Sequence, residues 1–184
     1  MDIPIQHCDG EILKRMNRKG DEKFLISLIN KIRERVSGVV LRTTLIAGFP
    51  GESEEQFESL CEFVKKARFD RLGCFAYSAE EGTAAAKFEG QLDDDVKARR
   101  AETVYDEQSR IMFEKNEEQI GKTIEVVCEG FDRYAECYFG RSYMDAPEID
   151  GKIFFKSDQK TAPGEFIDVT ITDTLDFDLL GERV

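Results

Sequence analysis

The sequence has little of what most metal and redox sites require. It contains a single histidine and five dispersed cysteines, and no two of the cysteines have CxxC spacing. A histidine-rich metal centre is therefore excluded, and we predict no metal ligands within the chain. An odd number of scattered cysteines instead indicates reduced, mostly buried thiols in a cytoplasmic protein.

Long apolar runs are also absent. No stretch approaches the roughly 18 apolar residues that a membrane span requires. The N-terminus lacks a basic segment followed by an apolar one, so no signal peptide is expected. The 41% hydrophobic content suits one large or two small globular domains in 184 residues.

Positive charge is scarce. The chain has 26 basic and 38 acidic residues, which gives a net charge of −12. This balance argues against broad binding to nucleic-acid phosphates and permits a basic protein partner.

What the sequence does have is a strand, a glycine loop and a helix in succession. Residues 39–47 are mostly apolar and β-branched, which is typical of a strand buried on both faces. Gly48-Phe49-Pro50-Gly51 ends the strand, and Ser53 with Gln56 has the spacing of a capping box. A helix is therefore predicted from about residue 54. In parallel α/β folds such a loop lies where ligands bind, although a bare turn would look similar.

Two further strands flank this unit, at residues 2–7 and 71–77. Asp9 and Asp21 each have the position of a helix cap, and a long helix is predicted over 93–118. Three strands separated by helices predict a parallel sheet with right-handed crossovers. Three strands do not close a barrel, so at least one edge of the sheet is expected to be unpaired.

From Gly121 the chain consists of short strands and turns. Five short strands are typical of a small closed antiparallel barrel, which places a domain boundary near residue 119. Residues 121–184 hold 7 basic and 14 acidic side chains, so the acidity is denser here than in the rest of the chain. The predicted strands are Thr123–Cys128, Tyr134–Phe139, Lys152–Phe155, Phe166–Thr172 and Phe177–Leu180.

The predicted strand ends bring three groups to one rim of the sheet. These are Gln6-His7, the loop 48–52, and Tyr77-Ser78 with Glu81. Chemistry in barrel-type folds sits at that carboxyl rim. His7 alone is more often a satisfied core histidine than a catalyst.

Arg42 shares one face of its strand with Thr44 and Ile46, because side chains alternate along a strand. If that face points inward, Arg42 is a buried cation that requires an anionic partner. The partner is either a ligand carboxylate or a neighbouring strand through a structural salt bridge, and both interpretations stay open.

At these residues the sequence resembles the radical S-adenosylmethionine methylthiotransferases over essentially its whole length. The fold implied is a partial (βα) barrel with three parallel strands over 1–118, followed at 119–184 by a TRAM domain, an OB-like five-stranded antiparallel barrel. The stretches that carry the resemblance are Ile3-Pro4-Ile5-Gln6-His7, Leu13–Arg18, Leu41-Arg42-Thr43, Gly48–Glu52, Phe75-Ala76-Tyr77-Ser78 and Glu81-Gly82-Thr83.

The resemblance implies an S-adenosylmethionine site and two 4Fe-4S clusters in the intact enzyme. The family's CxxxCxxC motif is missing here, so the cluster ligands are not in this chain, and we expect the chain alone to be inactive. The family's catalytic residues are not identified. A reductant such as flavodoxin or ferredoxin is implied. The implied cofactor-binding residues are Gln6, Arg42, Thr44, Ile46, Gly48, Phe49, Gly51, Glu52, Tyr77 and Ser78.

Within this family, residues 140–151 and the ending 176–182 resemble the branch that methylthiolates an aspartate β-carbon of small-subunit ribosomal protein twelve. A cluster of carboxylates would repel tRNA and attract a basic ribosomal protein. A tRNA-adenosine methylthiotransferase, a non-enzymatic binding module and a merely solvated acidic turn remain the alternatives. The expected substrate-docking residues are Arg141, Asp145, Glu148 and Asp150.

Overall fold

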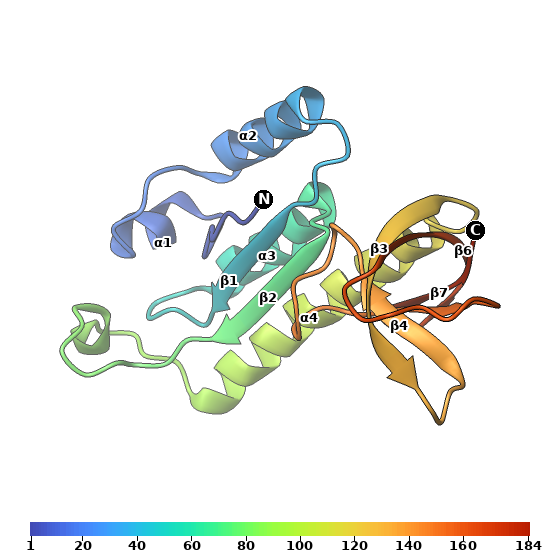
Figure 1. Ribbon diagram of the computed structural model, residues 1–184. Coiled ribbons are helices and arrows are strands. Elements are labelled where there is room, and N and C mark those ends of the chain that lie inside the picture. The colour runs from blue at the N-terminus through green and yellow to red at the C-terminus, as the bar shows by residue number, and fades with distance from the viewer. The chain divides into compact units, whose positions relative to one another are not determined.

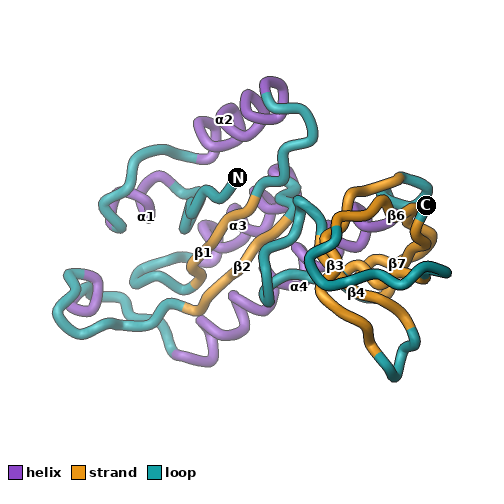
Figure 2. The backbone as a smooth tube through the Cα atoms, viewed as in Figure 1, coloured by secondary structure: helices purple, strands orange, loops and turns teal.

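The computed structural model describes residues 1–184 and divides them into two units, Met1–Ile111 and Met112–Val184. Helix α4 (Asp94–Glu117) begins in the first unit and ends in the second. The domain boundary near residue 119 therefore stays a prediction. The other elements of the first unit are α1 (Gly10–Arg15), α2 (Glu22–Arg35), β1 (Arg42–Ala47), α3 (Glu54–Ala67), β2 (Arg71–Ala76) and the 3-10 turn Ala85–Lys87 (Figures 1 and 2).

A small parallel sheet organises the first unit. Strands β1 and β2 pair in register, from Arg42 with Arg71 to Ala47 with Ala76. The segment before α1 runs parallel to β1 on its other side, where Gln6 N donates to Thr44 O at 2.8 Å. It is bridged to β1 at two points rather than forming a continuous strand. Between the bridges the Thr43 hydroxyl contacts the segment, where it donates to Ile3 O at 2.8 Å and accepts the N–H of Ile5 at 3.4 Å. The predicted parallel arrangement is thus present, with its first strand irregular.

The helix starts lie where the sequence predicts them. Asp9 accepts the N–H groups of the first turn of α1, and Asp21 caps α2 in the same way. Ser53 and Gln56 form the predicted capping box at the start of α3, with both reciprocal hydrogen bonds present. Each of these caps satisfies backbone donors that the first turn of a helix leaves without an intrahelical partner.

One face of the β1–β2 sheet carries the hydrophobic core of the first unit. Residues Leu41 and Leu45 on or beside β1 are fully buried, and α3 runs behind the sheet (Figure 1). The burial of apolar side chains alternates along β1, so Arg42, Thr44 and Ile46 belong to the opposite, half-buried face. The helices add to this core Leu25, Ile29, Phe57, Leu60, Phe63, Val64, Ala67, Val104 and Ile111.

The second unit is a closed five-stranded barrel with the order β3-β4-β5-β7-β6. Four of its five strand pairs are antiparallel and β5–β7 is parallel, so the predicted OB-like barrel is confirmed with mixed rather than purely antiparallel pairing. Its strands are β3 (Thr123–Asp132), β4 (Cys137–Arg141), β5 (Ile153–Lys156), β6 (Phe166–Leu175) and β7 (Asp178–Arg183).

The second of the predicted barrel strands begins later than the sequence suggests. Asp132 Oδ1 accepts the N–H groups of Tyr134 and Ala135, which builds a turn where the apolar pattern predicts a strand. Tyr134 is fully exposed and Glu136 has a φ of 51°, so β4 starts only at Cys137. The barrel interior is lined chiefly by β-branched side chains and Phe155. None of the helices combines the length and the apolar character needed to cross a membrane.

Candidate functional site

The loop between β1 and α3 is held in place by contacts with other residues of the chain. Gly48 and Gly51 both have a φ of 76°, a conformation that side chains disfavour. A Cβ added to Gly48 would lie 2.6 Å from Cγ of Lys97, and one on Gly51 would lie 2.5 Å from a guanidinium nitrogen of Arg15. The backbone conformation therefore requires glycine at both positions, and at Gly48 the stem and backbone of Lys97 also leave no space for a side chain. This requirement exists whether or not a ligand approaches their backbone.

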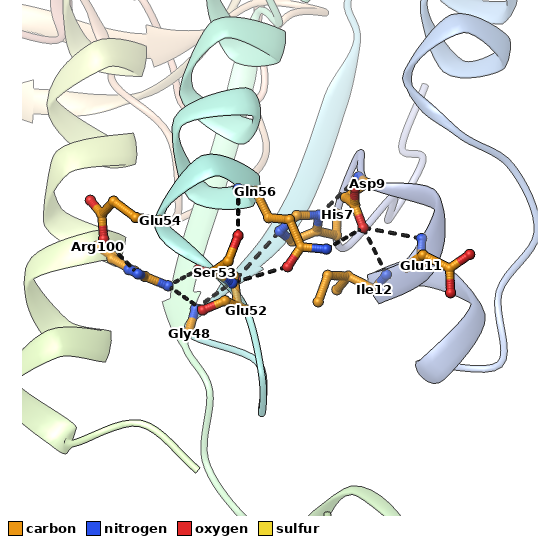
Figure 3. A network of polar contacts seen from close by, with 10 residues as sticks. All are labelled: His7, Asp9, Glu11, Ile12, Gly48, Glu52, Ser53, Glu54, Gln56 and Arg100. Carbon is orange, nitrogen blue, oxygen red and sulfur yellow. Dashed lines mark hydrogen bonds and ion pairs between the residues drawn. The ribbon is translucent and has the colours of Figure 1, made fainter. Parts of the chain in front are cut away.

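A buried carboxylate fastens this loop to the rest of the unit (Figure 3). The side chain of Glu52 is fully buried, and its Oε2 accepts the N–H of Gly48 at 2.9 Å. Arg100, from α4, donates to Glu52 Oε1 at 2.8 Å and to its backbone carbonyl at 3.0 Å. The same guanidinium reaches Glu54 at 2.7 Å, at the start of α3. Glu52 and Arg100 together thus connect the loop with α3 and α4.

His7 completes the contacts of this carboxylate. Its Nδ1 accepts the N–H of Asp9 at 2.9 Å, so the proton of a neutral imidazole lies on Nε2. Nε2 lies 3.4 Å from Glu52 Oε2, which is an electrostatic contact with poor hydrogen-bond geometry. The ring is completely buried. His7 is therefore buried, as expected of a core histidine, but its Nε2 has no hydrogen-bond partner, so it is only partly satisfied.

The contacts of Glu52 decide its protonation. Burial by itself would raise the pKa of the Glu52 carboxyl, but the contacts with His7, the Gly48 N–H and Arg100 together hold that pKa below its ordinary value. The carboxylate is therefore ionised at neutral pH and paired with Arg100. Its role in the structure is to fix the loop.

A second polar chain continues from this point toward α1 (Figure 3). Gln56 donates to Asp9 Oδ1 at 2.8 Å, and the same oxygen caps α1. Gln56 also accepts the N–H of Ser53 in the capping box. The starts of α1 and α3 are consequently tied to each other. No local sequence pattern signals this link, because Asp9 and Gln56 lie 47 positions apart.

The face of the sheet opposite the core is the open surface nearest to this loop. It carries Arg42, Thr44 and Ile46 of β1, whose partners on β2 are Arg71, Gly73 and Phe75. Phe75 is 61% exposed. The predicted shared face of Arg42, Thr44 and Ile46 is thus present and only half-buried.

The remaining predicted site residues lie around the rim. Gln6 has a φ of 74°, and its carbonyl accepts the N–H of Ile46 at 2.8 Å. Phe49 is buried against the ring of Tyr77 at 5.3 Å between centroids. The Tyr77 hydroxyl is buried without a hydrogen-bond partner, whereas Ser78 is exposed. The rim therefore includes one polar atom that a bound molecule is able to satisfy.

Two residues of this region were not identified from the sequence. Arg100 and Lys97 lie on α4, some fifty positions after the loop that they contact, in a helix whose pattern is mainly charged. A buried arginine in such a helix gives no periodic signal. Only the tertiary structure brings it to Glu52.

The predicted docking cluster of the barrel has a local role as well. Asp145 accepts from the N–H and the hydroxyl of Ser142, and Asp150 accepts from the N–H of Ala146. Glu148 is exposed, and Arg141 is paired with Glu129 at 2.8 Å. Of the three carboxylates, those of Asp145 and Asp150 therefore stabilise the turn, and Glu148 remains the most available to a partner.

The thiols do not fit an iron–sulfur cluster. Burial raises the pKa of Cys8 and Cys74 to about 12 and that of Cys61 to about 11, which disfavours the thiolate that a cluster requires. No group of three or more histidine, cysteine or carboxylate side chains is arranged to hold a metal ion.

Comparison with known proteins gives two family matches. Residues 1–64 match the radical SAM superfamily, and residues 120–184 match the TRAM domain. The chain is similar over nearly its whole length to proteins named ribosomal protein uS12 methylthiotransferase RimO. It is 46% identical over 182 residues to that of Caldanaerobacter subterraneus and 51% identical over 183 residues to that of Caldicellulosiruptor saccharolyticus.

These relatives are longer than the chain, which spans 41% of the length of each. Among solved structures, coproporphyrinogen III oxidase from Escherichia coli, a radical SAM enzyme, has a TM-score of 0.45 and 23% identity. That match covers 62% of this chain and 26% of the oxidase. The sequence matches confirm the predicted resemblance to the radical S-adenosylmethionine methylthiotransferases.

Proposed function

We propose that this chain is the C-terminal part of an enzyme that methylthiolates the β-carbon of an aspartate in ribosomal protein uS12. The observation that supports this most strongly is the similarity of the whole chain, at 46–51% identity, to proteins that carry that name. The small parallel sheet followed by a five-stranded barrel agrees with this proposal. The alternatives are a tRNA-adenosine methylthiotransferase and a non-enzymatic binding fragment.

The acidic barrel favours the protein substrate over tRNA. Residues 121–184 have 14 acidic and 7 basic side chains, a balance that repels phosphates and attracts a basic ribosomal protein. We assign Arg141, Asp145, Glu148 and Asp150 to substrate docking, with Glu148 as the most available carboxylate. A ribosomal substrate implies a cytoplasmic reaction, and a reductant such as flavodoxin or ferredoxin would serve the intact enzyme.

We assign S-adenosylmethionine to the open face of the sheet and its rim. In the intact enzyme S-adenosylmethionine and a 4Fe-4S cluster would together supply the radical chemistry for hydrogen abstraction. This chain contributes to binding and orientation. Its half-buried sheet face, its rigid glycine loop and the unpaired Tyr77 hydroxyl fit a polar ligand with a planar base. The assigned residues are Gln6, Arg42, Thr44, Ile46, Gly48, Phe49, Gly51, Glu52, Tyr77 and Ser78.

Glu52 acts within this assignment as a positioning residue. Its side chain is fully buried and its oxygens are taken by Gly48, Arg100 and His7. It therefore holds the loop that borders the ligand rather than contacting the ligand itself.

A chimera tests the proposed function directly. The segment of the Caldicellulosiruptor saccharolyticus protein that matches this chain is replaced by residues 1–184, so the rest of that protein supplies the parts this chain lacks. We expect the chimera to add one methylthio group to uS12, as detected by mass spectrometry of the purified substrate. Modification of a tRNA anticodon stem-loop instead would favour the tRNA branch. A folded, cluster-containing chimera that modifies neither substrate would contradict the enzyme assignment.

A further inference from the structure

Strand β2 has a free edge. Its first residue donates its N–H to Leu41 O at 3.1 Å, and Tyr77, just beyond its end, donates to Ala47 O at 2.9 Å. Because backbone groups alternate in direction along a strand, the N–H and C=O groups of Leu72, Cys74 and Ala76 point away from β1. These groups make no hydrogen bond within the chain.

The edge lacks three of the features that commonly protect a strand from pairing. Strands at sheet edges are commonly blunted by proline, lysine or a β-bulge. The sequence of β2, RLGCFA, contains no proline or lysine, and its pairing with β1 has no register shift. Phe75 and Ala76 are exposed, and Gly73 has no side chain to obstruct a neighbour. The C-terminal half of β2 is therefore open to another strand.

This edge borders the face to which we assign the cofactor. Gly73 and Phe75 of β2 are the register partners of Thr44 and Ile46 on β1. A strand added beside β2 would lie about 4.8 Å from it and would place alternate side chains on that same face. A backbone segment at this position brings its side chains next to the site.

We propose that the free edge of β2 docks an extended segment of the protein substrate by strand addition, through the backbone groups of Leu72, Cys74 and Ala76. The inference rests on the proposed function, because it takes the substrate to be a basic protein. Rows of backbone donors and acceptors are complementary to another polypeptide backbone. Glu80 and Glu81 are exposed just beyond the strand and complement positive charge on that segment.

Amide hydrogen exchange of the 184-residue chain tests the proposal at single residues. Purified uS12 is added, and exchange is followed by NMR. We expect the exchange of the Leu72, Cys74 and Ala76 amides to slow at least tenfold on addition of uS12. The amides of Gly73 and Phe75 point to β1, so their exchange is the internal control and should change little.

A proline variant tests the same edge by affinity. Ala76→Pro removes one outward N–H, and proline is tolerated in edge strands at such positions. We expect about tenfold weaker binding of uS12 in calorimetric titration, because a hydrogen bond is lost and the proline ring obstructs the added strand. Ala76→Val keeps the N–H and should bind as the unmodified chain does.

The outcomes separate this inference from the proposed function. Binding of uS12 without protection of the three amides would overturn strand addition and leave the proposed function standing. The absence of any uS12 binding would overturn the inference and also count against uS12 as the substrate. Protection that appears with protein concentration alone would show that a second copy of this chain occupies the edge, which would equally overturn the proposal.

Discussion

The two units use their carboxylates in opposite ways. In the first unit Glu52 is fully buried, and its charge is compensated by Arg100 at 2.8 Å. In the barrel Glu125 and Asp168 lie opposite each other on β3 and β6 and are exposed, as is Glu148. A buried, paired charge acts over one contact and is costly to expose alone, whereas exposed charges act together at longer range and are screened by salt. The same residue type is thus structural in one unit and available for recognition in the other.

Removal of the cation that pairs with Glu52 should have the largest effect. Arg100→Met leaves a buried carboxylate without its guanidinium, which we expect to lower the free energy of unfolding by about 3–5 kcal/mol. Urea denaturation of the full chain measures this loss. Arg99→Met, at the exposed neighbouring position, is the control and should change stability by less than about 0.5 kcal/mol. Equal effects of the two substitutions would show that Glu52 does not depend on Arg100.

Substitution of the loop glycine should have the next largest effect. Gly51→Val forces a β-branched residue to a φ of 76° and against Arg15, at an expected cost of about 1–3 kcal/mol. We also expect S-adenosylmethionine affinity to fall in the chimeric enzyme. Gly82→Val is the matched control, because Gly82 has a φ of 83° and nothing within 4 Å of an added Cβ. Unchanged affinity in Gly51→Val would limit the role of the loop to turn geometry.

The lowered pKa of Glu52 predicts a dependence of stability on acid. Burial opposes ionisation, but the contacts with His7, Gly48 and Arg100 keep the folded-state pKa below the unfolded value of about 4.3. The contribution of Glu52 to stability is therefore complete above about pH 4.3 and is lost as the pH falls through the folded-state pKa. Unfolding free energies between about pH 7 and 3 should fall less steeply for Glu52→Gln, whereas Glu58→Gln on the exposed side of α3 should leave the slope unchanged.

Reversal of an exposed barrel charge should have the smallest effect on stability and a selective effect on binding. We expect Glu148→Lys to slow association with uS12 several-fold at low salt and to leave stability within about 0.5 kcal/mol. The difference should fade at high salt, because the Debye length falls from about 10 Å at 0.1 M to about 3 Å at 1 M. Stopped-flow association rates measure this.

Asp145→Lys is the informative comparison for that experiment. It removes the acceptor of the Ser142 N–H and hydroxyl, so it should also destabilise the barrel by about 1 kcal/mol. If both reversals slow association without any loss of stability, the turn does not depend on Asp145.

Local features of the fold could be predicted from the sequence because their causes lie within a few residues. The capping box of Ser53 and Gln56, the caps Asp9 and Asp21 and the alternation along β1 are all short-range patterns, and the structure confirms them. The predicted start of β4 at Tyr134 was wrong, because the turn at Asp132 forms where the apolar pattern resembles a strand.

The glycine loop that borders the proposed site could be predicted by the same reasoning, but the contacts of its residues could not. The sequence alone determined that a glycine loop follows a buried strand and that an acidic barrel ends the chain. Only the tertiary structure decided that Glu52 is paired with Arg100 and that Arg15 and Lys97 fill the space at the glycines. These contacts join segments roughly 35 to 50 positions apart in the chain. Pairings at such distances depend on how helices and strands pack, and no periodic pattern in a single sequence encodes them.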